Sequence, residues 1–276
     1  MVTTLKGIVS TIDFHVTSDC NQKCPYCWGP QDYNKPVDTD IALRIVSRVK
    51  GIGARRIVFT GGDPLKRNDL AKLIRHAKQV GLEVALSTSG DELTKGFLNE
   101  VAPYLDLISL PLDGSTEEKN AKTKEKGHFS AIMRDLDWLK KYPEIDVKLC
   151  TPVTRYNLDD VPDIVKLADE YAKSTQAGVF YNIFQAYPRA MHSVDWQDLL
   201  VTDAEFQRLR RRIPATARIR VNFLDHETLD KLYMMIFPDG SLIIPRGKEF
   251  INFGPFLETE DFDVALSNSE FDSSKH

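Results

Sequence analysis

The sequence RRIVFTGGDPLKRNDLAKLIRHAKQVGLEVALSTSG, residues 55–90, contains a complete strand–helix–strand unit. Residues 55–60 form a short run with consecutive apolar side chains, which is typical of a buried strand. Residues 68–80 have the apolar spacing of an amphipathic helix that ends at Gly81, and residues 82–88 form a second apolar run. Two short strands joined by a helix predict parallel pairing.

The same alternation continues on both sides of this unit. Further strands are predicted at residues 8–16, 105–112, 147–153 and 178–187, and further helices at residues 40–49, 91–101, 129–140 and 158–171. This order favours an α/β fold in which helices cover a parallel sheet. Functional loops of such sheets lie at the carboxyl ends of the strands. The sequences TSDC, GGDP, TSG, LDG, TPVT and YPRA all fall at these ends and predict one shared site.

The pattern changes after residue 190. The later elements predicted are a helix at residues 203–212, a strand at residues 218–224 and a hairpin at residues 231–244 that turns at the sequence PDG. We therefore predict a catalytic barrel over residues 1–190 and an extension over residues 191–257 that covers it. Residues 258–276 are predicted to be an acidic, partly disordered tail with little to pack.

The composition is that of an ordinary globular protein. Of 276 residues, 42% are hydrophobic and 28% charged, and the net charge is −4. This charge gives no reason to expect binding to nucleic acid or to an anionic membrane. No apolar run approaches the roughly 20 residues of a membrane span, and residues 1–12 lack the features of a signal peptide. We therefore expect a cytoplasmic protein whose thiols are reduced.

Three of the four cysteines lie in the sequence SDCNQKCPYCWGP, residues 18–30, with the spacing C-x3-C-x2-C. Cys20, Cys24 and Cys27 supply three soft thiolates, so a four-iron cluster would keep one iron free for an outside ligand. A structural zinc completed by Cys150 or His15 is one alternative. A plain electron-transfer cluster closed by Cys150 is another.

These motifs together resemble the radical S-adenosylmethionine superfamily. The cysteine spacing with Tyr26 before the last cysteine is similar to the signature of that family, and GGDP, LSTSG and SLPLDG are similar to its motifs after the second, third and fourth strands. The resemblance covers residues 8–187 and implies a partial (β/α)6 parallel barrel. It also implies one [4Fe–4S] cluster on the three cysteines, with S-adenosylmethionine on the open iron.

The resemblance further implies which residues bind S-adenosylmethionine. They are Tyr26, Gly61, Gly62, Asp63, Pro64, Ser87, Thr88, Ser109, Asp113 and Lys124. The GGDP loop is expected to receive the methionine amino group, and the serine and threonine hydroxyls to contact the ribose or the carboxylate. Lys124 or Lys122 stands where relatives carry an arginine for the carboxylate, although lysine-rich segments are also typical of a solvated surface. Asp113 is either a ligand contact or the cap of its own loop.

Substrate contacts are expected from the fifth and sixth strands. Alternation places Lys148 and Cys150 on one side of the fifth strand. Cys150 is either a hydrogen donor to a substrate radical, as in some radical epimerases, or a small buried hydrophobe. Gln185, Tyr187 and Arg189 follow the sixth strand, and Arg189 is either an anchor for a substrate carboxylate or phosphate or a surface ion-pair partner.

The leading hypothesis is an enzyme that cleaves S-adenosylmethionine and abstracts hydrogen from a small polar metabolite such as a sugar, nucleoside or nucleotide. Its partner would be an external electron donor such as flavodoxin or ferredoxin. The sequence VKLCTPVTRYN, residues 147–157, and a C-terminal hairpin without cysteines are also similar to viperin-like nucleotide dehydratases. Three further hypotheses are a peptide-modifying enzyme, a Cys150-dependent epimerase and a non-catalytic iron–sulfur or zinc module. Four cysteines leave too few thiols for a second cubane.

Overall fold

The computed structural model describes residues 9–29, 35–188, 196–214, 218–229, 233–260 and 262. The described strands are β1 (Thr11–His15), β2 (Arg56–Thr60), β3 (Glu83–Ser87), β4 (Leu107–Pro111), β5 (Asp146–Val153), β6 (Val179–Gln185), β7 (Arg220–Leu224), β8 (Met235–Ile236), β9 (Ser241–Arg246) and β10 (Glu249–Pro255). The described α-helices are α1 (Thr39–Gly51), α2 (Leu70–Gln79), α3 (Lys95–Val101), α4 (Glu117–Asn120), α5 (His128–Leu139), α6 (Val161–Lys173), α7 (Asp203–Arg212) and α8 (His226–Leu229). Short 3-10 turns occupy Pro64–Lys66, Ala102–Tyr104 and Trp196–Asp198.

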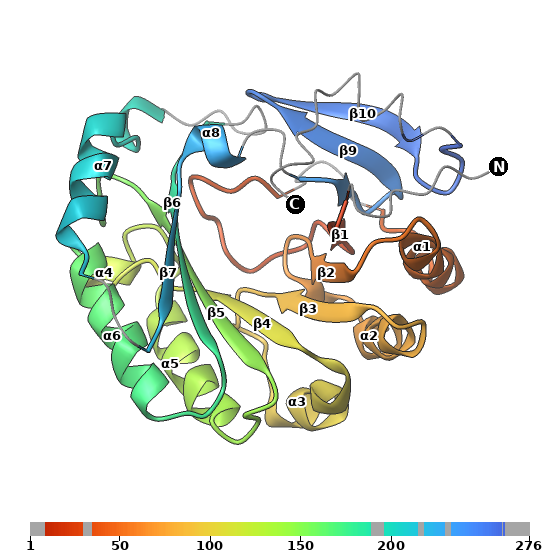
Figure 1. Cartoon of the computed structure of the whole chain (residues 1–276), viewed down its shortest axis with the longest axis horizontal. Coiled ribbons are helices and arrows are strands. Elements are labelled where there is room, and N and C mark those ends of the chain that lie inside the picture. Colours follow the sequence, from red (N-terminus) through yellow and green to blue (C-terminus); the bar gives the residue numbers. More distant parts are fainter. Residues whose placement is uncertain are drawn as a thin grey trace.

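All described strands join one sheet in the order β10-β9-β8-β1-β2-β3-β4-β5-β6-β7. The neighbours from β1 to β7 pair in parallel. The sheet curves around an interior, and the helices that follow its strands lie on its outer side (Figure 1). The predicted α/β class and partial parallel barrel are confirmed.

The strands after residue 190 extend the barrel sheet at both ends. β7 adds to β6 in parallel, and β8 lies parallel to β1 before it turns back into β9. The predicted hairpin at PDG is therefore present, whereas β10 was not predicted. The boundary between a catalytic barrel and an extension stays a prediction, because the sheet runs through both parts.

Helix α3 begins four residues later than predicted, at Lys95. Thr94 caps it by accepting a hydrogen bond from the backbone N–H of Phe97 at 3.1 Å. The preceding residues instead contact the cysteine loop, because Gln22 donates to Asp91 at 2.6 Å and Asn21 donates to Glu92 at 2.9 Å. This connection ties the third strand's loop to the first.

The strands bury their outer faces more fully than their inner faces. In β5, Val147, Leu149 and Val153 are fully buried against the helices, while the alternate side chains Lys148 and Cys150 are only partly buried. The residues of β6 alternate in the same way. A filled barrel would bury both rows, so this pattern indicates a hollow interior.

The chain beyond β10 includes a buried anchor. Phe262 is fully buried beside Phe256, with ring centroids 5.7 Å apart, and the guanidinium of Arg48 lies 5.6 Å from the ring of Phe262. Phe262 is thus a packed residue in the tail that was expected to have little to pack, and residues 263–276 lie outside the described part.

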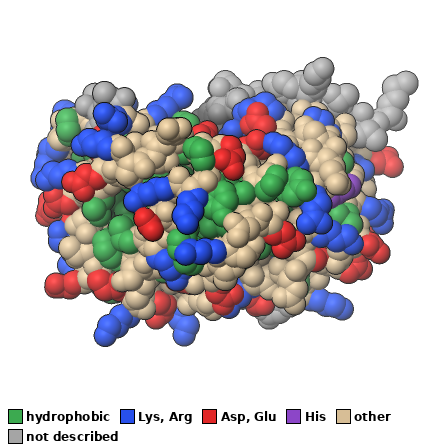
Figure 2. Space-filling model, turned by 90° about the horizontal axis from the view of Figure 1, so that it is seen from below, with side chains coloured by type: hydrophobic (Ala, Val, Ile, Leu, Met, Phe, Trp, Pro, Cys, Tyr) green, Lys and Arg blue, Asp and Glu red, His purple; other side chains and the backbone are tan. Residues whose placement is uncertain are grey.

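The outer surface of the molecule mixes charges of both signs. Figure 2 shows one face, on which acidic and basic side chains are interspersed and hydrophobic side chains reach the surface between them. None of the described helices has the length and apolar character needed to span a bilayer.

Candidate active site

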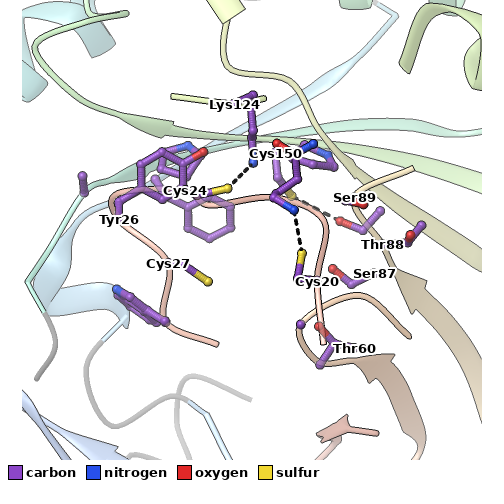
Figure 3. A pocket seen from close by; sticks show the side chains of 18 of the residues that line it. Cys20, Cys24, Tyr26, Cys27, Thr60, Ser87, Thr88, Ser89, Lys124 and Cys150 are labelled. Carbon is purple, nitrogen blue, oxygen red and sulfur yellow. Dashed lines mark hydrogen bonds between the residues drawn. The ribbon is translucent and has the colours of Figure 1, made fainter. Parts of the chain in front are cut away.

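The three clustered cysteines lie on the loop that follows β1. Cys20 is exposed, and Cys24 and Cys27 are half-buried. All three line one cavity of about 320 Å³ at the carboxyl ends of the strands. Figure 3 shows their side chains around this space, with Ser87 and Thr88 from the end of β3 nearby. We call this space the upper cavity.

Each of the three sulfur atoms accepts a hydrogen bond from nearby protein. The backbone N–H of Gln22 donates to Cys20 Sγ at 3.3 Å, and that of Gly29 donates to Cys27 Sγ at 3.2 Å. The ammonium of Lys124 donates to Cys24 Sγ at 3.2 Å (Figure 3). Donors of this kind stabilise thiolates, which are the form that binds iron. They fit a set of cluster ligands.

The zinc alternative needs a group of side chains around a single metal ion. Within the described ranges, no three His, Cys, Asp or Glu side chains come close enough together to hold one metal ion. Cys150 pairs with Ser109 at 3.3 Å, and His15 packs edge-on against Phe237. The described residues therefore give no support to the zinc alternative.

The glycines of the GGDP loop allow it to pack against the cysteine loop. A Cβ on Gly61 would lie 2.4 Å from the carbonyl oxygen of Thr17, and one on Gly62 would lie 2.3 Å from that of Asp19. The loops are joined by a hydrogen bond from Gly62 N to Thr17 O at 2.8 Å. Glycine is therefore needed here for the approach of two backbones, and Gly62 also lines the upper cavity.

Asp63 joins the GGDP loop to the TSG loop. Its carboxylate is fully buried and accepts hydrogen bonds from the hydroxyls of Thr88, at 2.6 Å, and Ser89. Burial raises the pKa of Asp63, and these donors oppose the rise. Pro64 begins the 3-10 turn that follows and is buried. The carboxylate thus holds two loops together, and a direct contact between Asp63 and S-adenosylmethionine stays a prediction.

A second buried carboxylate, Asp113, supports the cysteine loop from behind. It accepts hydrogen bonds from the hydroxyls of Tyr26 and Thr123, the latter at 2.7 Å. Lys124 lies 4.0 Å from the same oxygen and 5.4 Å from the centre of the Tyr26 ring. Although burial by itself lowers the pKa of Lys124, the charges of Cys24 and Asp113 hold it above its ordinary value. The ammonium of Lys124 therefore stays charged beside the sulfur of Cys24.

The predicted S-adenosylmethionine contacts do not all face the upper cavity. Residues that line it are Tyr26, Gly62, Ser87, Thr88, Ser109 and Lys124. Asp63 and Asp113 are instead fully buried, each in its own hydrogen-bond network. Lys122 is exposed, so of the two lysines only Lys124 lines this cavity.

A second and larger cavity lies inside the barrel. It has a volume of about 620 Å³ and is lined by inward-facing residues of β1 to β7. Thr60, Ser87, Ser109 and Cys150 line both cavities, so the two spaces adjoin. We call the second space the inner cavity. Lys148, predicted to contact substrate, lines it, and Cys150 stands at the junction.

The other predicted substrate contacts lie at the mouth of the upper cavity. Gln185 is buried and donates to Asp203 at 2.8 Å. The ring of Tyr187 stacks on His226 with centroids 5.3 Å apart. Both Gln185 and Tyr187 line the upper cavity. Arg189 lies outside the described residues.

Several lining residues were not anticipated from the sequence. The inner cavity receives Asp13 from β1, Asn182 from β6 and Asn222 from β7, and the upper cavity receives the aromatic side chains of Trp28 and Tyr233. Asp13 could have been noticed in the sequence, because a charged residue in the middle of an apolar strand is uncommon. The others come from the extension or from positions without a motif.

Comparison with known proteins assigns the chain to a class. A family model described as the Radical SAM superfamily matches residues 14–168, which include the end of β1, the cysteine loop and the strands β2 to β5. The chain belongs to this superfamily and is an enzyme whose cofactors are a [4Fe–4S] cluster and S-adenosylmethionine.

Two curated relatives that share one name match different shares of the chain. The chain is 27% identical over 269 residues to an S-adenosylmethionine-dependent nucleotide dehydratase of Flammeovirga pacifica, covering 91% of this chain and 88% of that protein. It is 33% identical over 165 residues to a protein of the same name from Lacinutrix mariniflava, covering 55% of this chain and 34% of that protein. The solved structure of anSMEcpe with bound AdoMet superposes with a TM-score of 0.68 at 15% identity, covering 97% of this chain and 83% of that one, which shows a shared fold.

Proposed function

We propose that this enzyme reductively cleaves S-adenosylmethionine and uses the resulting 5′-deoxyadenosyl radical to abstract hydrogen from a small polar metabolite. The substrate class is a sugar, nucleoside or nucleotide. The observation that carries this proposal is the junction of the two cavities, where the cysteine-lined space meets a polar space of about 620 Å³ inside the barrel.

Different residues of the chain would bind the cofactors in the upper cavity and the substrate in the inner cavity. Cys20, Cys24 and Cys27 would hold the cluster, and Ser87, Thr88 and Lys124 would orient S-adenosylmethionine beside it. The cofactors supply the radical chemistry, while the barrel supplies position and exclusion of water. A substrate in the inner cavity would meet the cofactors along the wall at Ser109 and Cys150.

A nucleotide is the member of this class that the two dehydratase relatives favour. The dehydratase of Flammeovirga pacifica matches across most of both chains, so its likeness includes the C-terminal extension as well as the family motifs. The inner cavity offers Lys148 for a phosphate and the amides Asn182 and Asn222 for hydroxyls or a base.

Epimerisation is a second candidate because of where Cys150 lies. Its thiol contacts the Ser109 side chain at 3.3 Å and lines both cavities. A thiol at this junction is placed to return a hydrogen atom to a substrate radical. Cys150→Ala should then spare cleavage of S-adenosylmethionine while blocking epimerised product, and unchanged product formation would remove this role.

The experiment that tests the proposal is anaerobic reconstitution with iron and sulfide, followed by reduction in the presence of S-adenosylmethionine. Deuterated sugars, nucleosides and nucleotides are added one at a time, and deuterium in 5′-deoxyadenosine is measured by mass spectrometry. The proposal predicts transfer of deuterium from at least one of them. Cleavage without transfer from any small metabolite would instead favour a peptide substrate. No cleavage under any reducing condition would overturn the proposed cleavage of S-adenosylmethionine.

A further inference from the structure

The inner cavity holds two opposite charges that the protein leaves unpaired. Asp13 enters from β1, and Lys148 enters from β5 on a different wall of the barrel. Within the described part of the chain, neither the Asp13 carboxylate nor the Lys148 ammonium makes a hydrogen bond or an ion pair. Unpaired charges in a secluded space are costly unless water or a ligand meets them.

The other charged groups that face the inner cavity have different surroundings. Arg56 donates two hydrogen bonds to Glu83, at 3.2 and 2.9 Å. Asp146 accepts a hydrogen bond from the backbone N–H of Gly178 at 3.0 Å. Arg220 is exposed on β7, and Tyr233 adds a phenol to the wall. Lys148 and Asp13 are therefore the cation and the anion with the most freedom to bind a ligand.

The lining of this cavity carries charges of both signs. Arg56, Lys148 and Arg220 are the basic side chains and Asp13 and Asp146 the acidic ones, and Arg56 is paired with Glu83 outside the lining. A triphosphate would bring several negative charges into a space whose cations without an ion pair among the described residues are the half-buried Lys148 and the exposed Arg220. The nearby Asp13 carboxylate would repel them.

The state of Asp13 depends on its surroundings. Burial raises the pKa of this carboxyl from 3.8 to about 6, although the positive charge of Lys148 opposes the rise. Asp13 is thus mostly ionised at neutral pH and becomes neutral in mildly acidic solution. Its repulsion of anions should follow the same transition.

We propose that the inner cavity binds a substrate with one compact anionic group at Lys148 and a hydroxyl or ammonium donor at Asp13, and that Asp13 selects against multiply charged ligands. This inference rests on the proposed function, because it names the chemistry of the metabolite in the same barrel. It favours a monophosphate or carboxylate over a triphosphate.

The test measures anion binding directly and needs no knowledge of the substrate. Sulfate is the probe because its charge does not change between pH 5 and pH 8. Its affinity for the reconstituted enzyme with S-adenosylmethionine bound is measured by calorimetry, and tripolyphosphate is measured in parallel. Lys148→Met should weaken sulfate binding about tenfold or more, whereas Lys148→Arg should retain it. Wild-type enzyme should bind tripolyphosphate no more tightly than sulfate.

Asp13→Asn gives the sharper result. This variant should bind sulfate about tenfold more tightly than wild type at pH 7.5, because one repelling charge is gone. The affinity of the wild-type enzyme for sulfate should rise as the pH falls through about 6. The Asp13→Asn variant should lose this pH dependence. Asp137→Asn, at an exposed site on α5, is the matched control and should behave as wild type. Circular dichroism of each variant verifies folding.

Two results would overturn the inference. One is sulfate binding that does not change in Lys148→Met, and the other is an Asp13→Asn variant whose affinity and pH dependence match wild type. Either result leaves the proposed function untouched if deuterium transfer from a small metabolite is observed. Conversely, sulfate binding as expected without any such transfer would remove the proposed function and leave an anion site without that role.

Discussion

The upper and inner cavities adjoin, yet the protein treats their polar groups in opposite ways. Around the upper cavity, Asp63 accepts from Thr88 and Ser89, and Lys124 donates to Cys24. In the inner cavity, Asp13 and Lys148 remain unpaired within the described chain. Satisfied networks are rigid and hold one fixed geometry. This contrast fits the proposal that the upper cavity holds the cofactors, which are the same in every turnover, and that the inner cavity receives the substrate.

The largest effect is expected when one cysteine thiol of the upper cavity is removed. Cys24→Ala should abolish the absorbance of the cluster, because the cubane loses one of its three protein ligands. The release of 5′-deoxyadenosine should fall by about 1,000-fold or more for the same reason. Cys150→Ala is the matched control, and it should retain the cluster and the cleavage. A Cys24→Ala enzyme that stays brown would show that the cluster ligands lie elsewhere.

The next largest effect should come from the buried carboxylate that joins two loops. Asp63→Ala leaves the hydroxyls of Thr88 and Ser89 without their acceptor and opens a cavity, so the free energy of unfolding should fall by about 2–4 kcal/mol. Affinity for S-adenosylmethionine should fall about 10-fold to 100-fold, because the strand-end hydroxyls lose their positions. Chemical denaturation and equilibrium dialysis measure the two quantities. If Asp63→Ala lost no more stability than the exposed variant Asp137→Ala, the joining role of Asp63 would be refuted.

Substitutions of Lys124 test two roles, one beside the cluster ligand Cys24 and one toward S-adenosylmethionine. Its ammonium is 3.2 Å from Cys24 Sγ and also lines the space predicted for S-adenosylmethionine. Lys124→Met should lower the reduction potential of the cluster, since a positive charge beside a ligand is lost, and should weaken S-adenosylmethionine about tenfold. Lys124→Arg should restore much of both. A variant with a shifted potential but unchanged affinity would leave Lys124 as a partner of the cluster alone.

The fold was predictable because each of its signals is local. Apolar runs such as residues 55–60 are short enough for strands, and the helices between them carry periodic apolar positions, so the parallel order followed directly. The residues at which helices begin were less predictable. Helix α3 starts at Lys95 rather than earlier because Asp91 and Glu92 bond to Gln22 and Asn21, and these partners lie far away in the sequence.

The two cavities also differ in what the sequence revealed. The upper cavity is made of loops with compact motifs, so Cys20, Cys24, Cys27 and Ser87 could be predicted from the sequence. Sequence reasoning did not reveal that Asp63 bonds to two hydroxyls, because hydrogen-bond partners on other loops leave no periodic signal. The inner cavity is made of single residues on separate strands, so Asp13 and Asn222 became neighbours of one space only once the sheet curved.

The smallest effect expected concerns the stability of the ligand-free protein, and it tests whether the inner cavity leaves its charge uncompensated. The pKa of Asp13 is about 6 in the folded protein and 3.8 as its ordinary value. Since folding raises this pKa, the protonated form is favoured in the folded state, and stability is lost as the pH rises through about 6. Asp13→Asn should therefore be more stable than wild type at pH 7.5, by about 1–3 kcal/mol. This advantage should shrink by about 1 kcal/mol at pH 5, where wild-type Asp13 is largely protonated. Urea denaturation at the two pH values measures it. An advantage that is absent, or that does not change with pH, would mean that a group in the protein already neutralises Asp13, and the contrast between the two cavities would then fail.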